Sequence, residues 1–72
     1  MNTVELEVAR IRKGKSRRDM AAATGKCLNA YAKKETGKTP FSDKEKLILA
    51  TELELSRDEF IAIFFDDVLP KR

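Results

Sequence analysis

The chain is patterned as a series of short amphipathic helices. Apolar residues recur at three- and four-residue spacing, and no segment shows the alternation of apolar and polar residues that marks a half-buried strand. A first helix is predicted from a cap at Asn2 or Thr3 to about Lys13, and Gly14 ends it. Its expected apolar face consists of Val4, Leu6, Val8, Ala9 and Ile11.

The segment from Ser16 to Lys38 has the pattern of two short helices joined by a tight turn. Ser16 is a favourable N-cap, and Asp19 three residues later completes a capping box. Gly25 can adopt the left-handed conformation that ends a helix, and Gly37 ends the second one. Helices of this length bury little surface alone, so they must pack on the rest of the chain. The pattern predicts a helix-turn-helix at residues 16–36.

Two further helices are predicted after Pro40, because a proline ring prevents the preceding helix from continuing. Each begins with a Ser-x-x-Glu capping box, and they extend from Ser42 to about Leu53 and from Arg57 to about Phe65. Their expected inward-facing residues are Leu47, Leu49, Ala50 and Leu53 in the fourth helix and Phe60, Ile61 and Phe64 in the fifth. The predicted fold is an all-α, compact five-helix bundle forming one domain over residues 1–72. The side chains expected to be largely buried are Leu6, Met20, Ala21, Tyr31, Leu49, Leu53 and Phe60.

Composition agrees with a small helical domain in the cytoplasm. The 72 residues are 42% hydrophobic and 38% charged, which suits a folded helical domain better than a disordered tail. No apolar run approaches eighteen residues, and the first ten residues lack the apolar core of a signal peptide, so neither a membrane span nor export is expected. The single cysteine cannot form an internal disulfide, which fits a reducing cytosol.

Positive charge is concentrated in the predicted helix-turn-helix. Ten basic and two acidic residues lie between Arg10 and Lys38, a net charge of +8, whereas the chain as a whole carries only +3. A basic region centred on this motif is an electrostatic signature of binding to phosphate backbones. The alternative is a solvated basic surface without a partner.

Residue types needed for catalysis and metal binding are scarce. Histidine is absent, which removes the usual general base and the commonest metal ligand. One cysteine without histidine cannot form a zinc site, and the three glycines are isolated rather than grouped in a phosphate-binding loop. We therefore expect no enzyme activity, no cofactor and no metal. A reactive Cys27 is less expected than a small residue at the start of a helix.

The sequence resembles the Cro and repressor helix-turn-helix family of temperate phages over nearly its whole length. The residues that carry the resemblance in the first half are Arg10, Lys13-Gly14, Ser16, Met20-Ala21, Gly25, Tyr31, Glu35 and Gly37-Lys38. In the second half they are Leu53, Leu55-Ser56 and Asp58-Glu59-Phe60. The resemblance implies a lambda-repressor-like fold. It also implies a transcriptional regulator of the lysis–lysogeny switch that inserts its third helix into double-stranded operator DNA in the bacterial host cytoplasm.

The resemblance also nominates residues for DNA contact. Arg17 would hold a phosphate, and Arg18 would assist it. Leu28, Asn29 and Lys33 would project toward base edges, with Asn29 able to pair bidentately with adenine. Just after the third helix, Lys38 and Thr39 would meet backbone phosphates. Lys26 also lies in the contact region.

An ion pair between Arg10 and Glu35 is a further implication of the resemblance. The family places an arginine of the first helix against a glutamate at the end of the third, and these two residues occupy those positions. A guanidinium suits a bidentate contact with a carboxylate in a tight core. The alternative is that the two residues are separate surface charges.

Five positions depart from the family pattern. Cys27 replaces the usual capping residue of the third helix, and Glu54 stands where the family often has a glycine. Lys26 and Lys34 occupy positions that are usually apolar, which is expected to loosen the packing beneath that helix. Leu28 places an aliphatic group where a polar base-reading residue is expected.

These departures leave a second function open. Leu28 can touch a thymine methyl group, or it can dock into a groove on another protein. In the second case the chain would be an antirepressor or corepressor that binds the helix-turn-helix domain of a partner phage repressor. The outer side of the last helix is the next candidate for a partner or a homodimer, and its residues are Ile63, Phe65, Val68 and Leu69.

Overall fold

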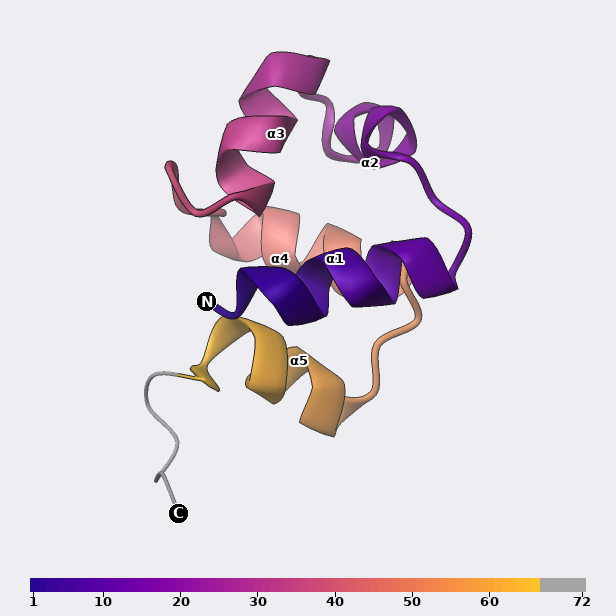
Figure 1. Cartoon of the computed structure of the whole chain (residues 1–72), viewed down its shortest axis with the longest axis vertical. Coiled ribbons are helices and arrows are strands. Elements are labelled where there is room, and N and C mark those ends of the chain that lie inside the picture. Colours follow the sequence, from indigo (N-terminus) through magenta and orange to yellow (C-terminus); the bar gives the residue numbers. More distant parts are fainter. Residues whose placement is uncertain (67–72) are drawn as a thin grey trace.

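Five α-helices follow one another in the computed structural model, which describes residues 1–66 and contains no strand in that range. They are α1 (Thr3–Arg12), α2 (Arg17–Thr24), α3 (Leu28–Glu35), α4 (Asp43–Glu52) and α5 (Arg57–Phe64). Figure 1 shows α2 and α3 at one end of the molecule, α5 at the other, and α1 with α4 between them. The all-helical prediction is confirmed, with helix ends within a residue or two of those expected. In this part of the chain, no helix has the length and apolarity needed to cross a membrane.

Side-chain caps define where four of the five helices begin. The Asn2 side chain accepts a hydrogen bond from the Glu5 amide at 3.1 Å. Reciprocal capping boxes, as predicted, start the second, fourth and fifth helices, at Ser16, Ser42 and Ser56. In the second helix the Ser16 amide donates to the Asp19 carboxylate at 2.8 Å, and this bond lowers the pKa of that carboxyl. The bonds that mark these helix starts join residues only three positions apart, so the local sequence indicates where the helices begin.

Residues with a left-handed backbone conformation follow four of the helices, at Gly14, Gly25, Gly37 and Glu54. Gly25, at φ 71°, closes α2, and its amide bonds back to the last turn of that helix. Glu54 adopts φ 51° just after α4, at the position where a glycine is usual in the family that the sequence resembles. A non-glycine residue in this conformation costs about 1–2 kcal/mol. Lys13 lies 3.3 Å from the Glu54 carboxylate and offsets a small part of this cost.

The core lies where the five helices meet. The second helix packs on α3 and α4, and the first packs on α5 and α3. An aromatic chain crosses the core, with ring centroids 6.0 Å apart for Tyr31 and Phe41 and 6.1 Å apart for Phe41 and Phe64. The radius of gyration is 11.5 Å, close to the value of about 11 Å for a compact chain of this size. Six of the seven predicted core residues are buried: Leu6, Met20, Ala21, Tyr31, Leu49 and Leu53.

The expected apolar face of α1 is wrong in part. Leu6 and Ala9 are buried, but the other three apolar residues, Val4, Val8 and Ile11, are exposed. A helix with apolar residues around most of its circumference can bury only one side. The buried side is the one that also carries Arg10, because this guanidinium must reach Glu35.

Three assignments in the fourth and fifth helices also need correction. Leu47 was expected to face inward, but it is 64% exposed on the outer side of α4. Phe60 is only partly buried and packs at the edge of the core, where its ring lies 5.0 Å from that of Phe64. Ile63 was assigned to the outer side of α5, but it is buried beside α1, whereas Phe65 is exposed as expected. Val68 and Leu69 lie outside the described residues.

Candidate binding surface on the second and third helices

The connection between α2 and α3 fixes which part of α3 faces outward. After Gly25, the Lys26 amide donates to the Ala21 carbonyl oxygen at 2.9 Å, which holds the turn against the end of α2. Cys27 is the N-cap residue of α3, and its side chain forms no capping hydrogen bond, as the sequence predicted. Leu28 follows Cys27 as the first residue of α3, and its side chain is 40% exposed.

The inner side of α3 carries a buried carboxylate, Glu35, that joins three helices. Arg10 donates from Nε to Glu35 Oε1 at 2.8 Å and from Nη1 to the Lys15 carbonyl oxygen at 2.8 Å. The Tyr31 hydroxyl donates to the same Glu35 Oε1 at 3.0 Å, and Arg17 Nε donates to Oε2 at 2.7 Å. The expected pair of Arg10 and Glu35 is present, and Arg17 and Tyr31 extend it. We refer to Glu35 with these three partners as the Glu35 cluster.

The geometry gives Arg17 a structural role in addition to the phosphate contact nominated for it. Besides its bond to Glu35, its Nη2 lies 3.7 Å from the Glu7 carboxylate. The hydrogen bond and charge of Glu35 raise the pKa of the Arg17 guanidinium. Its side chain is still 39% exposed, so water and a phosphate have access to it. A phosphate contact would nevertheless have to compete with two carboxylates.

A second buried carboxylate, Glu45, forms ion pairs with Lys34 and Lys26, the two lysines that depart from the family pattern. Lys34 Nζ donates to Glu45 Oε1 at 2.6 Å, and Lys26 Nζ lies 3.8 Å from Oε2. The same Oε1 accepts the Ser42 amide at 2.8 Å as part of the capping box of α4. Burial alone would raise the pKa of Glu45, but the hydrogen bonds from Lys34 and Ser42 prevail and lower it to about 2. We refer to Glu45 with Lys26, Lys34 and Ser42 as the Glu45 cluster.

The arrangement bears on the expectation that Lys26 and Lys34 loosen the packing beneath α3, because Lys34 has a partner for its charge. Lys34 is only 15% exposed, so its aliphatic stem lies along the core while its charge is neutralised by Glu45. Sequence reasoning missed this function of Glu45, because the capping box that starts at Ser42 already accounted for a glutamate at that position. The sequence did contain a signal for it. A lysine at a usually apolar position of one helix indicates that an acidic residue of another helix neutralises its charge.

The exposed side of α3 and the turn after it bring several nominated residues together. Asn29 and Lys33, four residues apart, lie on one face of the helix and are both exposed. The turn folds back onto the end of α3, because the amides of Lys38 and Thr39 both donate to the Lys33 carbonyl oxygen, at 2.9 and 3.2 Å. Lys33 and Lys38 form no ion pair within residues 1–66. We call these four residues with Leu28 the α3 surface.

Two further nominated residues, in addition to Arg17, lie outside the α3 surface. Arg18 is exposed on α2, and no hydrogen bond or ion pair within residues 1–66 links it to α3. Lys26 is exposed at the turn but is drawn toward Glu45. Cys27 is an exposed free thiol, and no group of three potential metal ligands occurs among the described residues.

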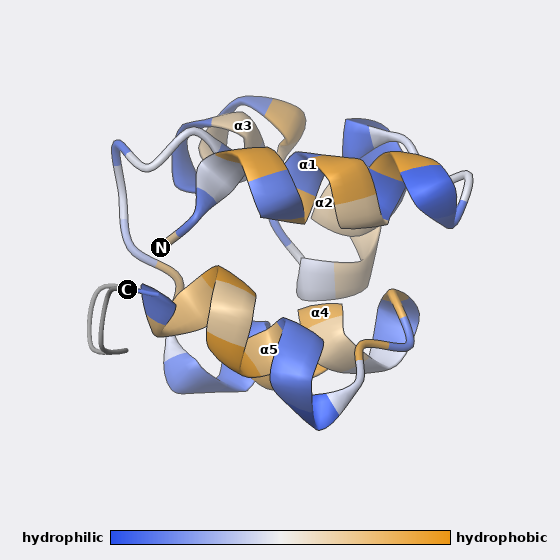
Figure 2. Ribbon diagram, turned by 60° about the horizontal axis from the view of Figure 1, so that its bottom comes forward, coloured by the Kyte–Doolittle hydropathy of each residue, from blue (hydrophilic) through white to orange (hydrophobic). Residues whose placement is uncertain are grey.

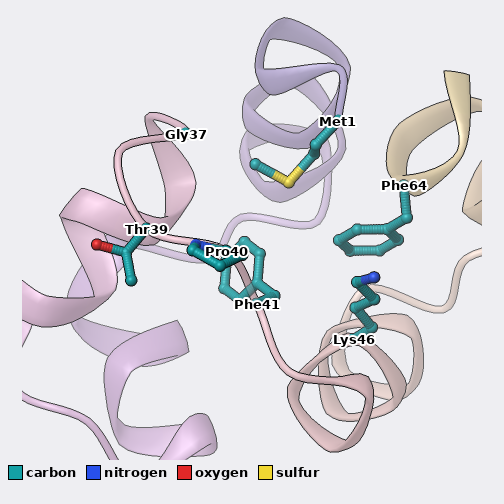
Figure 3. A pocket seen from close by; sticks show the side chains of 7 residues that line it. All are labelled: Met1, Gly37, Thr39, Pro40, Phe41, Lys46 and Phe64. Atoms are coloured by element: carbon teal, nitrogen blue, oxygen red, sulfur yellow. The ribbon is translucent and has the colours of Figure 1, made fainter. Parts of the chain in front are cut away.

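A hollow of about 340 Å³ lies beside the turn that carries Thr39, and sequence reasoning gave no sign of it. Figure 3 shows its mixed polar and apolar lining, with the nitrogen of Lys46 beside the ring of Phe64. The distance from Lys46 Nζ to that ring centroid is 6.0 Å, and it is 5.1 Å to the ring of Phe65. The lining residues are Met1, Gly37, Thr39, Pro40, Phe41, Lys46 and Phe64.

Comparisons with known proteins add no relative. No protein-family model, no curated protein and no solved structure matches the chain.

Proposed function

We propose that the protein is a transcriptional regulator that binds operator DNA through α3. The observation that carries the proposal is the composition of the α3 surface, where exposed Asn29 and Lys33 on the helix are followed by exposed Lys38 in the turn, and neither lysine forms an ion pair within residues 1–66. Asn29 would lie in the major groove and Lys38 with Thr39 would hold the adjacent phosphates, which is the division of labour in helix-turn-helix complexes. The net charge of +8 between Arg10 and Lys38 supports association with a polyanion.

We further propose that α2 and α3 form a helix-turn-helix of the lambda-repressor-like type. The uninterrupted order of five short helices and the pair of Arg10 with Glu35 support this assignment, together with the resemblance to phage Cro and repressor proteins. On this basis the regulated process would be the lysis–lysogeny switch of a temperate phage, and the site of action would be the host cytoplasm.

DNA binding is tested with fluorescently labelled duplexes from the protein's own promoter region, titrated at several salt concentrations. Replacing Lys38 with alanine should weaken binding to every sequence and reduce the salt slope by about one unit. Asn29→Ala should instead reduce the preference for the operator by about 1–3 kcal/mol. Lys44→Ala removes an exposed lysine on α4 and should change neither quantity. Association that is undetectable at low salt would contradict the proposal.

A second candidate function is that of an antirepressor of the modulator-of-repression type, which would bind the helix-turn-helix domain of a partner repressor. The observation that favours it is Leu28, an exposed aliphatic side chain on an otherwise polar surface, at the uncapped start of α3. An aliphatic group gains more in a desolvated protein groove than from one methyl contact on DNA. Because Lys33 and Lys38 belong to the same α3 surface as Leu28, the partner would have to supply carboxylates opposite these two lysines.

The two candidates are separated by a gel shift on the promoter DNA with and without the repressor encoded beside it. An antirepressor should release the repressor from DNA, and Leu28→Asp should abolish this effect with little change in melting temperature because the residue is exposed. The matched control is Leu47→Asp, which places the same change at an exposed leucine on α4. Full activity of the Leu28 variant would exclude this residue from docking.

A further inference from the structure

The outer side of α1 carries an apolar stripe that the other described residues, up to Asp66, leave exposed. Val4 is 65% exposed, Val8 37% and Ile11 62%. Their spacing of four and three residues places them on one face across two helical turns. Figure 2 shows the hydrophobic ribbon segments that recur along α1. The opposite side of α1 packs in the core, so the apolar residues of the stripe are not needed for folding. We call these three residues the α1 stripe.

Charges flank the α1 stripe in a pattern that is complementary to itself. Glu5 and Arg12 are seven residues apart, which is close to two full turns, so they lie on the same flank at opposite ends of the stripe. Both are exposed, and neither forms an ion pair within residues 1–66. On the other flank, Glu7 is 3.7 Å from Arg17 of the same chain.

We propose that the α1 stripe is the contact surface of a homodimer in which two copies of α1 pack antiparallel about a two-fold axis. With the axis near Val8, the two Val8 side chains meet and each Val4 meets Ile11 of the second copy. A two-fold axis perpendicular to both helices places the same flank of the two copies on the same side of the dimer. The two copies of that flank run in opposite directions. Glu5 of each copy then faces Arg12 of the other, and the contact occurs twice.

A second copy fits this stripe better than an unrelated partner because the stripe supplies both halves of the charge pattern. Parallel packing of two copies would oppose like charges, so the charges select the antiparallel arrangement. Valine and isoleucine have few side-chain rotamers to lose, which lowers the entropic cost of association. A helix of ten residues is only about 15 Å long, so the interface belongs to the small class below about 1,200 Å², and the dimer is expected to be concentration-dependent.

The inference is independent of the proposed function, since the α1 stripe and the α3 surface share no residue. Its first test is sedimentation velocity of the full chain from micromolar to millimolar concentration. The wild type should shift from monomer to dimer, and Ile11→Asp should stay monomeric throughout with an unchanged melting temperature. Leu47→Asp, the same kind of change at an equally exposed position on α4, should dimerise like the wild type.

Charge reversal tests the antiparallel geometry. Glu5→Arg and Arg12→Glu each oppose like charges twice in the dimer, and each should raise the Kd for dimerisation about tenfold at low salt. The double variant restores both pairs with reversed polarity and should return the Kd to within about threefold of the wild type. The proposal is overturned if the wild type stays monomeric, if Ile11→Asp dimerises normally, or if Leu47→Asp abolishes the dimer. It is equally overturned if the double variant is no better than the single ones.

Discussion

Glu35 of α3 and Glu45 of α4 are both buried glutamates, yet the chain holds them in different ways. Glu35 is 2% exposed and is bound by two guanidinium groups and a phenol that come from α1, α2 and α3 itself. Glu45 is 6% exposed and is bound by one ammonium group and by the cap of its own helix, with Lys26 at 3.8 Å. The first carboxylate therefore connects three helices, whereas the second caps its own helix and pairs with one close lysine and one more distant lysine.

The difference shows how the type of cation decides what a buried carboxylate does. Arginine presents a planar fork whose hydrogen bonds fix the direction of the helix that carries it. Arg10 uses one edge of that fork for Glu35 and another for the Lys15 carbonyl oxygen, so it also orders the loop between α1 and α2. A lysine such as Lys34 is a point charge on a flexible stem, which neutralises Glu45 but orients α3 less strictly. We therefore expect the two clusters to contribute different amounts to the free energy of unfolding, and these contributions to depend differently on pH.

Loss of the Glu35 carboxylate should have the largest effect. Glu35→Ala leaves Arg10 buried without its partner and should reduce the free energy of unfolding by about 3–5 kcal/mol. The measurement is chemical denaturation followed by circular dichroism. Glu7→Ala is the matched control, because it removes an exposed glutamate that also contacts Arg17 and should cost less than about 0.5 kcal/mol. Equal stability of the two variants would show that Glu35 has no connecting role.

Loss of the Glu45 carboxylate should have a smaller effect. Glu45→Ala removes the capping bond and leaves the nearly buried Lys34 unpaired, at an expected cost of about 1–3 kcal/mol. Glu59→Ala is an unusually close control, since Glu59 occupies the same capping-box position on α5 but is exposed and forms no ion pair within residues 1–66. The excess loss in the Glu45 variant measures the contact with Lys34, and an equal loss in both variants would contradict it.

The Glu45 cluster should also make the protein sensitive to acid. The pKa of Glu45 is about 2 in the fold and 4.5 in its ordinary state, so the unfolded chain binds this proton more tightly. Its stabilisation is complete above about pH 4.5 and is lost as the pH falls toward 2. In Glu45→Gln this part of the pH dependence should be absent. Parallel curves of unfolding free energy against pH for the variant and the wild type would refute the assignment.

Tyr31 should give the Glu35 cluster the opposite pH response, with a smaller effect. Burial and the charge of Glu35 raise the pKa of the Tyr31 phenol above its ordinary value of 10.0. The folded state then keeps a proton that the unfolded chain releases, so stability is complete below about pH 10 and declines above it. Tyr31→Phe should lose about 1 kcal/mol at neutral pH and show a weaker alkaline decline. An unchanged decline in the variant would assign it to other groups.

Arg17 should contribute least to folding among the partners of Glu35. Its side chain is 39% exposed, and Arg10 remains on Glu35 without it, so Arg17→Ala should cost about 0–1 kcal/mol. Binding to DNA offers the sharper measurement. If the two carboxylates hold Arg17 away from phosphates, the salt slope of the variant should match the wild type, whereas Lys38→Ala should reduce it by about one unit. A reduction of the same size for Arg17 would show that it leaves Glu35 to bind a phosphate.

The sequence by itself determined the local architecture. Serine caps with an acid three residues later marked the starts of three helices, and Gly25 marked the turn before α3. These signals work because capping bonds join residues within one helical turn, so no knowledge of the remaining chain is needed. The buried pair of Arg10 and Glu35 was found through resemblance to a family, since nothing local connects residues that far apart.

Only the tertiary structure decided which side of each helix is buried and which charges meet. Leu47 and Ile11 had the spacing of core residues but lie outside, because their helices are apolar on more than one side and the neighbours cover only one. Arg17 and Lys34 appeared as free positive charge in the sequence, but Glu35 and Glu45 engage them. Helical periodicity gives the angle of a residue around its own axis and not the direction of that axis relative to the other helices. Contacts between helices depend on both.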